Sequence, residues 1–365
     1  MNTFSLHSKR PLLIAGPCSA ETEEQTVQTL TKIAQTGMVD VLRAGIWKPR
    51  TNPGSFEGIG VKGLPWLVRA KELTGLPIAT EVATGKHVEN ALQFGIDILW
   101  VGARTTVNPF SVQEIADAVR GSDVKVLIKN PMSPEVDLWA GAVNRFMKVG
   151  VRTEDLGLIH RGFSAFGQSE YRNATMWHLA FEMRNRFPGM FMVCDPSHIA
   201  GKREYLQELS QKAADLNYDG LMIESHISPR DAWSDAAQQI TPDELDTLLR
   251  GISWRRTTTD NPEYIEALEQ LRREIDQFDA EIFTLLSRRM DTSEKIGRVK
   301  LDNNVAILQS DRWQSIVDRV VSRYSNYGLS DEFLRTILEA IHIESINRQN
   351  RVMSGAGGAG GAGGK

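Results

Sequence analysis

Eight short apolar runs divide the first 250 residues, and amphipathic stretches of helix length separate most of them. Such alternation is typical of a parallel sheet, because parallel strands need long crossover connections. The runs that we expect to form strands are Leu12–Ala15, Val39–Arg43, Pro77–Glu81, Ile96–Val101, Val124–Ile128, Leu156–Ile159, Phe191–Cys194 and Gly220–Ile223. Eight such strands predict an α/β fold, a (β/α)8 barrel of the TIM type.

Nearly every run ends in a polar or charged side chain. In a (β/α)8 barrel the carboxyl ends of all strands lie on one face, where the reactive residues of such proteins gather. Stability alone does not require a charge at each of these places. The residues in question are Cys18, Arg43 with Lys48, Glu81, Arg104, Lys129, Arg161, Asp195 with His198, and Glu224. We therefore expect an active site at this face.

Four side chains expected at this face have metal-binding chemistry. Cys18, His198, Glu224 and Asp235 offer a thiolate, an imidazole and two carboxylates. This set predicts a site for a divalent metal ion, and it accepts several such ions. A cysteine can also be a small core residue, which is our interpretation of Cys194. The position of Cys18 at the mouth of the first strand favours a ligand there.

Composition shifts divide the chain into two domains. Residues 1–250 contain the eight runs, and the polar, turn-rich segment 251–263 is typical of a linker. Residues 264–353 have a helical period of apolar residues instead. The Gly/Ala repeat at 354–365 is of low complexity, and we expect it to be disordered.

The helical domain begins with an unusually long apolar stripe. Asn261 is the expected N-cap, and the steps of three and four that follow predict one helix of about 37 residues, roughly 55 Å long. Two shorter helices are expected over Ser310–Tyr324 and Asp331–Met353. Three helices of this kind cannot bury their stripes within one copy, which predicts a homodimer through the helical domain.

Polar and cationic side chains lie on the apolar faces of these helices. Arg289 falls on the stripe, and Lys300 is within about 20° of the same face. Ser345 and Gln349 continue the apolar face of the third helix. Together they predict a pocket for a small polyanion such as a dicarboxylate. Arg272 is about 26 Å from Arg289 along the axis, so it can serve such a pocket only from a second protomer.

The overall composition excludes several classes of partner. The net charge is −4 without a basic block, which argues against nucleic acid. No apolar run approaches the ~18 residues of a membrane span, and we expect no secretory leader, because no apolar h-region is present near the N-terminus. Two cysteines in 365 residues favour a reducing compartment, so we expect a cytoplasmic protein. Little chain precedes the first strand, and we expect no separate regulatory domain there.

The motifs of both domains resemble known enzyme families. GPCS, LRAGIWKPRTNPGSFEG, GAR, LIKNP, HRGF, CDPSH and IESH with SDAAQ resemble the type Iβ synthases of 3-deoxy-D-arabino-heptulosonate 7-phosphate (DAHP). LRREIDQFD, LLSRRM, IGRVK, SDRW and ESINRQ resemble the all-helical chorismate mutases. The resemblance implies a bifunctional enzyme of aromatic biosynthesis in the shikimate pathway. One domain would condense phosphoenolpyruvate with erythrose 4-phosphate, and the other would convert chorismate to prephenate.

The resemblance also implies roles for single residues of the barrel. The metal, for which the family points to Mn2+, would be bound by Cys18, His198, Glu224 and Asp235. The phosphoenolpyruvate cations correspond to Arg43, Lys48, Arg104, Lys129 and Arg161. Erythrose 4-phosphate would bind near Arg50 and Thr51. Cys18, Lys48, Lys129 and His198 would be the catalytic residues among them.

For the helical domain the resemblance places Lys300 and Gln349 at the breaking ether bond. Arg289, Arg312 and the partner's Arg272 would bind the carboxylates, with Ser345 beside them, and Arg289 would act in catalysis with Lys300 and Gln349. Gln309 and Trp313 stand where the family usually has acidic residues. We still expect activity, because the rearrangement needs positioned charges rather than acid–base chemistry.

Three alternatives remain open at this point. The barrel also resembles 3-deoxy-octulosonate 8-phosphate synthase, although that family carries a different stretch in place of KPRT. A Schiff-base aldolase using Lys129 would need no metal. The helical domain could be a dimerisation and ligand-sensing module without catalysis. We further expect prephenate or chorismate to bind this domain and inhibit the barrel; the sequence leaves the effector and the metal unidentified.

Overall fold

The structure is a computed structural model that describes residues 4–50, 52, 54–165, 170–308 and 310–355. It contains two compact units, residues 1–257 and residues 258–365. The division falls inside the segment 251–263 that the composition marks as a linker. Each unit is described by itself below.

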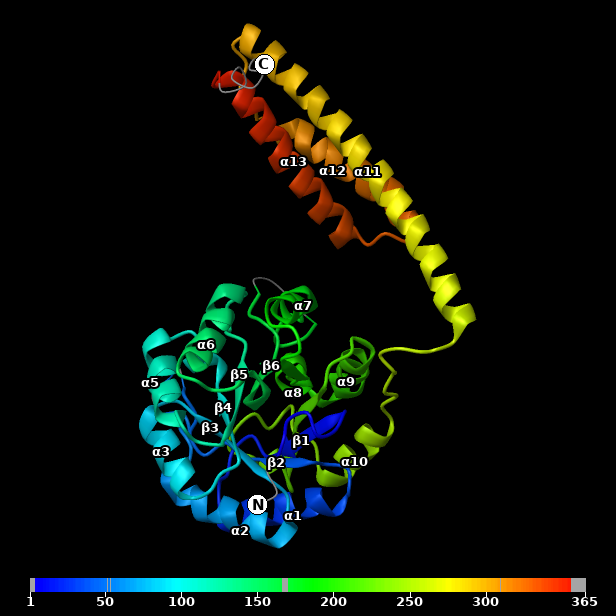
Figure 1. Cartoon of the computed structure of the whole chain (residues 1–365). Helices are drawn as coiled ribbons and strands as arrows, with labels where there is room; N and C mark the ends of the chain where they lie inside the picture. The colour runs from blue at the N-terminus through cyan, green and yellow to red at the C-terminus, as the bar shows by residue number, and fades with distance from the viewer. Residues whose placement is uncertain (1–3, 51, 53, 166–169, 309, 356–365) are drawn as a thin grey trace, which may run out of the picture. The chain divides into compact units, whose positions relative to one another are not determined.

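The first unit is a closed barrel of eight parallel strands in sequence order, ringed by helices (Figure 1). The strands are β1 (Leu12–Gly16), β2 (Val41–Arg43), β3 (Ile78–Val82), β4 (Ile98–Val101), β5 (Lys125–Lys129), β6 (Leu156–His160), β7 (Phe191–Cys194) and β8 (Gly220–Glu224). The predicted barrel is confirmed, and the strand bounds differ from the predicted ones by at most two residues.

Helices connect the strands on the outside of the barrel. They are α1 (Glu23–Gln35), α2 (Leu64–Thr74), α3 (Gly85–Gln93), α4 (Ala103–Thr106), α5 (Pro109–Val119), α6 (Val136–Lys148), α7 (Trp177–Arg186), α8 (Pro196–Ala200), α9 (Leu206–Asp215) and α10 (Pro242–Arg250). Several begin at a side chain that accepts a hydrogen bond from the first turn, as Thr22 does for α1 and Thr84 for α3.

Alternate residues of each strand point to opposite sides of the barrel wall. Leu13 and Ala15 pack outward in the large core between strands and helices, which also contains Cys194 as predicted. Leu12 and Ile14 point inward, and with Trp100 and their counterparts from other strands they fill the barrel interior. The interior is therefore a packed core, and it leaves only the rim for a site.

The barrel closes between its first and last strands. β1 pairs with β8 in register from Leu12 opposite Gly220 to Gly16 opposite Glu224. A Cβ atom on Gly220 would lie 1.9 Å from the carbonyl oxygen of Leu12, so the strands approach too closely for any side chain there. The close pairing brings the ends of two strands that are distant in sequence to one place on the rim.

The described residues of the second unit form three α-helices, as predicted. They are α11 (Pro262–Asp302), α12 (Ser310–Tyr324) and α13 (Asp331–Met353). Asn261 caps α11 by accepting hydrogen bonds from the backbone N–H groups of Glu263 and Tyr264. Among the residues that the structure describes, no helix is both long and apolar enough to cross a membrane.

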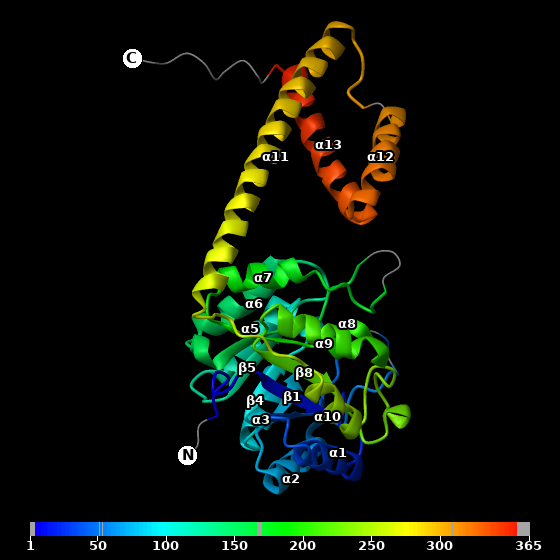
Figure 2. The same ribbon diagram turned by 90° about the vertical axis from the view of Figure 1, so that its right-hand side faces the viewer.

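Only the C-terminal part of α11 packs against α13, as Figure 2 shows. The buried residues of α11 are Met290, Ser293 and Gly297. Gly297 permits a close approach, because a Cβ atom there would lie 3.1 Å from Cα of Gln349 on α13. The N-terminal part presents its apolar stripe to solvent, and exposed fractions are 57% for Leu271, 56% for Ile275, 53% for Phe278, 48% for Ile282 and 61% for Leu285.

Candidate active sites

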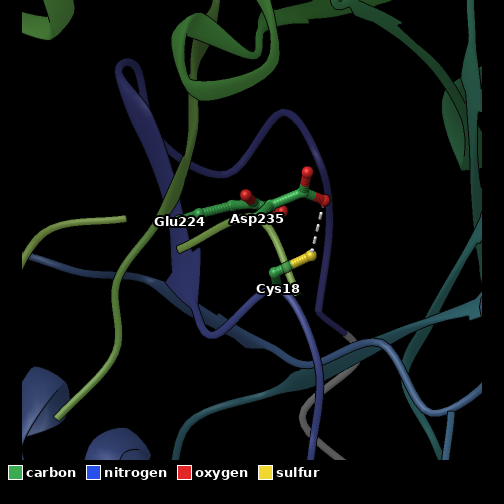
Figure 3. Close-up of side chains that lie close together, drawn as sticks. All are labelled: Cys18, Glu224 and Asp235. Carbon is green, nitrogen blue, oxygen red and sulfur yellow. Dashed lines mark hydrogen bonds between the residues drawn. The ribbon is translucent and has the colours of Figure 1, made fainter. Parts of the chain in front are cut away.

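Three of the four predicted metal ligands converge on the barrel rim. Cys18 follows β1, Glu224 ends β8, and Asp235 lies in the loop after β8. One ligand atom from each lies within 4.8 Å of the others (Figure 3). Cys18 Sγ donates a hydrogen bond to Asp235 Oδ2 at 3.2 Å. The β1–β8 register therefore assembles a thiol and two carboxylates in one place.

The fourth predicted ligand adjoins this cluster. His198 lies on α8 just after β7, and its Nε2 is 3.7 Å from Glu224 Oε1. Its Nδ1 lies 2.8 Å from Asp195 Oδ2, and its backbone N–H donates to Asp195 Oδ1 at 3.1 Å. A carboxylate behind a histidine typically fixes which ring nitrogen faces a metal. The arrangement turns Nε2 toward the cluster.

The electrostatics of the cluster suit a cation. Burial raises the pKa of the Cys18 thiol to about 12, and the Glu224 carboxylate adds to this rise. Burial is the largest single influence on Glu224 and Asp235 and opposes their ionisation. The pKa of both is nevertheless lowered by their neighbours together, His198 first, then Arg43 for Glu224 and Arg172 for Asp235.

Glu224 Oε1 is buried without a hydrogen-bond partner among the described residues. A sulfur, an imidazole nitrogen and carboxylate oxygens are also a donor set for divalent transition metals. Oε1 is ion-paired with Arg43 Nη1 at 3.3 Å, and a bound cation would supply a second positive partner and would favour the thiolate of Cys18. The residues present therefore fit a divalent metal ion.

A cavity of about 270 Å³ opens beside the cluster. Its walls contain five of the predicted substrate-binding cations, together with Glu81, His198 and Asp235. These cations are Lys48, Arg50, Arg104, Lys129 and Arg161. Such a density of positive charge is typical of a site for phosphorylated substrates. Thr51, predicted beside them, lies outside the residues that the structure describes.

Buried ion pairs hold several of these cations in place. Lys129 Nζ donates to Asp195 Oδ2 at 2.8 Å. Lys48 Nζ lies 3.8 Å from Glu81 and donates to the carbonyl oxygen of Cys18 at 3.1 Å. Burial lowers the pKa of Arg161 to about 10, which leaves it charged near neutral pH. Lys48 and Lys129 are therefore held in place in the cavity wall.

Arg43 lies beneath the cavity instead of in its wall. It is fully buried, its guanidinium is 4.6 Å from the ring centre of Trp100, and its Nη1 is 3.3 Å from Glu224 Oε1. A charge at 0% exposure is stable only when it is paired. In this structure the partner of Arg43 is Glu224, one of the candidate metal ligands.

One further cation, Arg172, is not indicated by the sequence pattern. It lines the cavity, and its Nη1 donates to Asp235 Oδ1 at 2.8 Å. The next residue, Asn173, accepts from Arg161 Nη1 at 2.9 Å. Both lie in the long loop after β6, away from any apolar run. Counting strand ends cannot find residues of this kind.

The helical unit brings together part of its predicted pocket. Arg289 Nη1 donates to Ser345 Oγ at 2.5 Å. Gln349 is only 8% exposed, and its Oε1 has no hydrogen-bond partner among the described residues. Lys300, at the end of α11, donates to the carbonyl of Ile307. A buried amide without a partner is costly, which indicates that a ligand or another chain completes this site.

The remaining described residues predicted for this pocket do not lie beside Arg289 and Ser345. Arg312 on α12 is exposed, whereas the next residue, Trp313, stacks on His342 of α13 with ring centres 4.1 Å apart. Arg272 is exposed on the free part of α11. Gln309 lies outside the described residues. The carboxylate-binding roles of Arg272 and Arg312 stay predictions.

Comparison with family models decides the classification. The model described as the DAHP synthetase I family matches residues 6–260. The chain belongs to the DAHP synthetase I family. A second model, chorismate mutase type II, matches residues 271–350. The resemblance drawn from the motifs is therefore confirmed for both regions of this DAHP synthetase family member.

Individual relatives of this chain support the same classification. A phospho-2-dehydro-3-deoxyheptonate aldolase of Thermotoga maritima is 30% identical over 228 residues, which cover 62% of this chain and 64% of that protein. A crystal structure of the Thermotoga maritima DAHP synthase superposes with a TM-score of 0.59 at 26% identity, covering 67% of this chain and 68% of that one. A 2-dehydro-3-deoxyphosphooctonate aldolase of Geobacter sp. M21 is 27% identical, covering 66% of this chain and 90% of that protein.

Proposed function

We propose that the barrel condenses phosphoenolpyruvate with erythrose 4-phosphate to give DAHP and inorganic phosphate. The observation that carries this proposal is the Cys18–Glu224–Asp235 cluster beside a cavity lined by cations. Two phosphorylated substrates need many cations, and arginine binds phosphate through two parallel hydrogen bonds. The membership in the DAHP synthetase I family supports the same reaction.

The cavity residues have distinct roles in this proposal. Arg104, Lys129 and Arg161, with Lys48, bind the phosphate and carboxylate of phosphoenolpyruvate, and Arg50 with Thr51 binds the phosphate of the aldehyde. Asp195 orients both His198 and Lys129, since its carboxylate contacts both side chains. A divalent ion, for which the family points to Mn2+, would be held by Cys18, His198, Glu224 and Asp235 and would polarise the aldehyde as a Lewis acid.

The choice of the aldehyde substrate separates the two nearest functions. The octulosonate synthases use a five-carbon sugar phosphate, and a protein named for that activity matches this chain over 90% of its own length. The KPRT stretch at 48–51 favours the four-carbon aldehyde. The test is product formation with phosphoenolpyruvate, Mn2+ and either erythrose 4-phosphate or arabinose 5-phosphate. Equal or faster turnover of arabinose 5-phosphate would contradict the proposal.

The Schiff-base alternative is disfavoured by the surroundings of Lys129. A lysine that attacks a carbonyl must be neutral, but Lys129 Nζ donates to the Asp195 carboxylate at 2.8 Å. The ion pair also leaves Nζ engaged with Asp195 rather than available for attack. Borohydride treatment in the presence of substrate should therefore trap no adduct on Lys129, and a trapped adduct would favour the aldolase.

We propose that the helical unit is a chorismate mutase whose site is shared between two protomers. Its support is the Arg289–Ser345 contact, the unpartnered amide of Gln349 and the exposed stripe of α11. Positioned charges can stabilise a pericyclic rearrangement without proton transfer. A second copy on the stripe would bury the exposed apolar side chains and bring its Arg272 to the pocket.

We further propose that this unit senses prephenate or chorismate and inhibits the barrel. The basis is the fusion of the two domains through residues 251–263. Coupling of this kind must come from different affinities for two states, typically ~1–3 kcal/mol. The measurement is the synthase rate against added prephenate, in the intact protein and in residues 1–257 alone. Inhibition of both to the same extent would place the effector site in the barrel.

A further inference from the structure

Two consecutive glutamines, Gln238 and Gln239, fasten the loop that carries Asp235. Their exposed fractions are 1% and 0%. Burying an amide is costly unless its donor and acceptor are both satisfied. The structure satisfies both residues, and in each case the partners belong to the candidate metal ligands or to their immediate neighbours. This placement distinguishes them from glutamines that merely fill the core.

Gln238 connects the two carboxylates of the cluster. Its Nε2 donates to Glu224 Oε2 at 2.6 Å, and its Oε1 accepts from Arg172 Nη1 at 2.9 Å. The same Arg172 nitrogen donates to Asp235 Oδ1 at 2.8 Å. One continuous chain of hydrogen bonds therefore runs from Glu224 through Gln238 and Arg172 to Asp235.

The contact with Gln238 makes the two oxygens of Glu224 unequal. Oε2 is occupied by the amide, whereas Oε1 has no hydrogen-bond partner among the described residues. Oε1 is also the oxygen that lies 3.7 Å from His198 Nε2. Gln238 thus holds Oε2, and Oε1, which is ion-paired with Arg43 Nη1 at 3.3 Å, faces the other candidate ligands.

Gln239 connects the two ends of the cluster. Its Oε1 accepts from the backbone N–H of Cys18 at 2.9 Å, and its Nε2 donates to the carbonyl oxygen of Ser234 at 2.8 Å. Ser234 directly precedes Asp235, whose φ of +49° is uncommon for a residue with a side chain. A residue keeps such a conformation only when its surroundings hold it, and Gln239 joins the residue before Asp235 to Cys18, in the segment after β1.

We propose that Gln238 and Gln239 are positioning residues of the metal centre. Gln238 makes Glu224 offer a single oxygen, and Gln239 sets the distance between Cys18 and Asp235. This inference rests on the proposed metal-dependent function. A glutamate that binds through one oxygen occupies one coordination position instead of two, and more positions remain for substrate.

The test uses the full-length protein and two probes, Mn2+ and Co2+. Mn2+ affinity is measured from the electron paramagnetic resonance signal of the free ion, and Co2+ reports its thiolate bond through a charge-transfer absorption band. Gln238→Met and Gln239→Met remove the amides at nearly constant volume. Residues that orient metal ligands commonly contribute 10–100-fold to metal affinity, so each variant should bind Mn2+ at least ~10-fold more weakly.

The two variants should differ in their Co2+ spectra. Gln239→Met should weaken the thiolate band, because Cys18 loses its anchor. Gln238→Met should keep that band and change the visible bands, which depend on coordination number, because both oxygens of Glu224 become available. If Gln238→Met does not fold, Gln238→Leu removes the same amide without adding a charge, and the same loss of affinity is expected.

Gln211→Met is the matched control. The Gln211 amide also joins two segments, through the N–H and carbonyl of Ser253, but it has no contact with the cluster. It should lower thermal stability and leave the Mn2+ affinity and the Co2+ spectrum unchanged. The inference would be overturned if the folded Gln238 and Gln239 variants kept wild-type Mn2+ affinity and Co2+ spectra, or if the control lost as much Mn2+ affinity as they do. Neither result would affect the proposed metal-dependent function. Absence of Mn2+ and Co2+ binding by the wild-type protein would overturn the proposed metal-dependent function as well.

Discussion

A mixing experiment can decide whether two protomers share the mutase site. Arg272 and Arg289 are 17 residues apart on one continuous helix, or about 26 Å at 1.5 Å per residue. A guanidinium cannot span that distance, so both act on one substrate only if Arg272 belongs to the partner subunit. Arg272→Ala and Lys300→Ala should each lower kcat/KM by about 100-fold or more, as is usual when a charge-stabilising group is removed.

The recovery after mixing follows from the symmetry of the proposed dimer. In a heterodimer of the two variants, one site lacks both groups and the other has neither defect. Random exchange of equal amounts makes half of the dimers heterodimers, so about a quarter of all sites, and about a quarter of wild-type activity, should return. The assay is the disappearance of chorismate absorbance after exchange in mild denaturant, with heterodimers counted by native mass spectrometry.

A second pair of variants provides the control. Arg289→Ala and Lys300→Ala both alter the pocket of their own chain, so every site of their heterodimer has one defect and mixing should restore nothing. If mixtures of Arg272→Ala with Lys300→Ala form heterodimers yet stay at the level of the separate variants, the shared-site reasoning is refuted.

Three further predictions concern the barrel. Chelation should abolish DAHP formation and Mn2+ should restore it, while Cys18→Ser, which alters a candidate ligand itself, should weaken Mn2+ binding by at least the ~10-fold expected for residues that only orient ligands; undiminished turnover after chelation would contradict the proposed metal centre. Burial lowers the pKa of His160 to about 3. Between about pH 3 and pH 6.5 only the unfolded chain therefore binds a proton at this histidine. The free energy of unfolding should fall by about 1.4 kcal/mol for each pH unit below 6.5 within this range. Urea unfolding of His160→Gln should show a smaller fall, and an identical slope would argue against the assignment. Gly220→Ala should destabilise the barrel by on the order of 3 kcal/mol or more, since its Cβ would overlap the Leu12 carbonyl, whereas Gly141→Ala, within α6 and with open space around it, should stabilise it by about 0.5–1 kcal/mol in thermal unfolding.

The parts of the fold that the sequence could predict share one property, which is local periodicity. Apolar runs separated by amphipathic stretches are enough to locate eight strands, and parallel strands then place their carboxyl ends on one rim. This is why the amino-acid sequence alone is enough to predict that Cys18 and Glu224 lie near each other. The three helices follow from the same kind of pattern, and the buried residues of α13, including Ser345 and Gln349, have the predicted spacing.

Residues in irregular segments could not be placed by such reasoning. Arg172, Gln238 and Gln239 lie in loops, where contacts depend on the path of the backbone rather than on a repeat. The rotation of a helix about its own axis is also hard to predict. In α12 it directs Trp313 toward α13 and leaves the neighbouring Arg312 exposed. Residue spacing does not determine which of two adjacent side chains faces the neighbouring helix when both fit the edge of the apolar face.

The pairing of β1 with β8 has a consequence for the order in which the protein can mature. The thiol of Cys18 and the carboxylate of Asp235 are separated by 217 residues of chain. During synthesis Cys18 emerges early, whereas Asp235 emerges only when almost the whole barrel has left the ribosome. Closing a loop of this length is a late step in folding. A metal ion captured there would bind only molecules whose first and last strands have met, and its binding energy would act directly on that final closure.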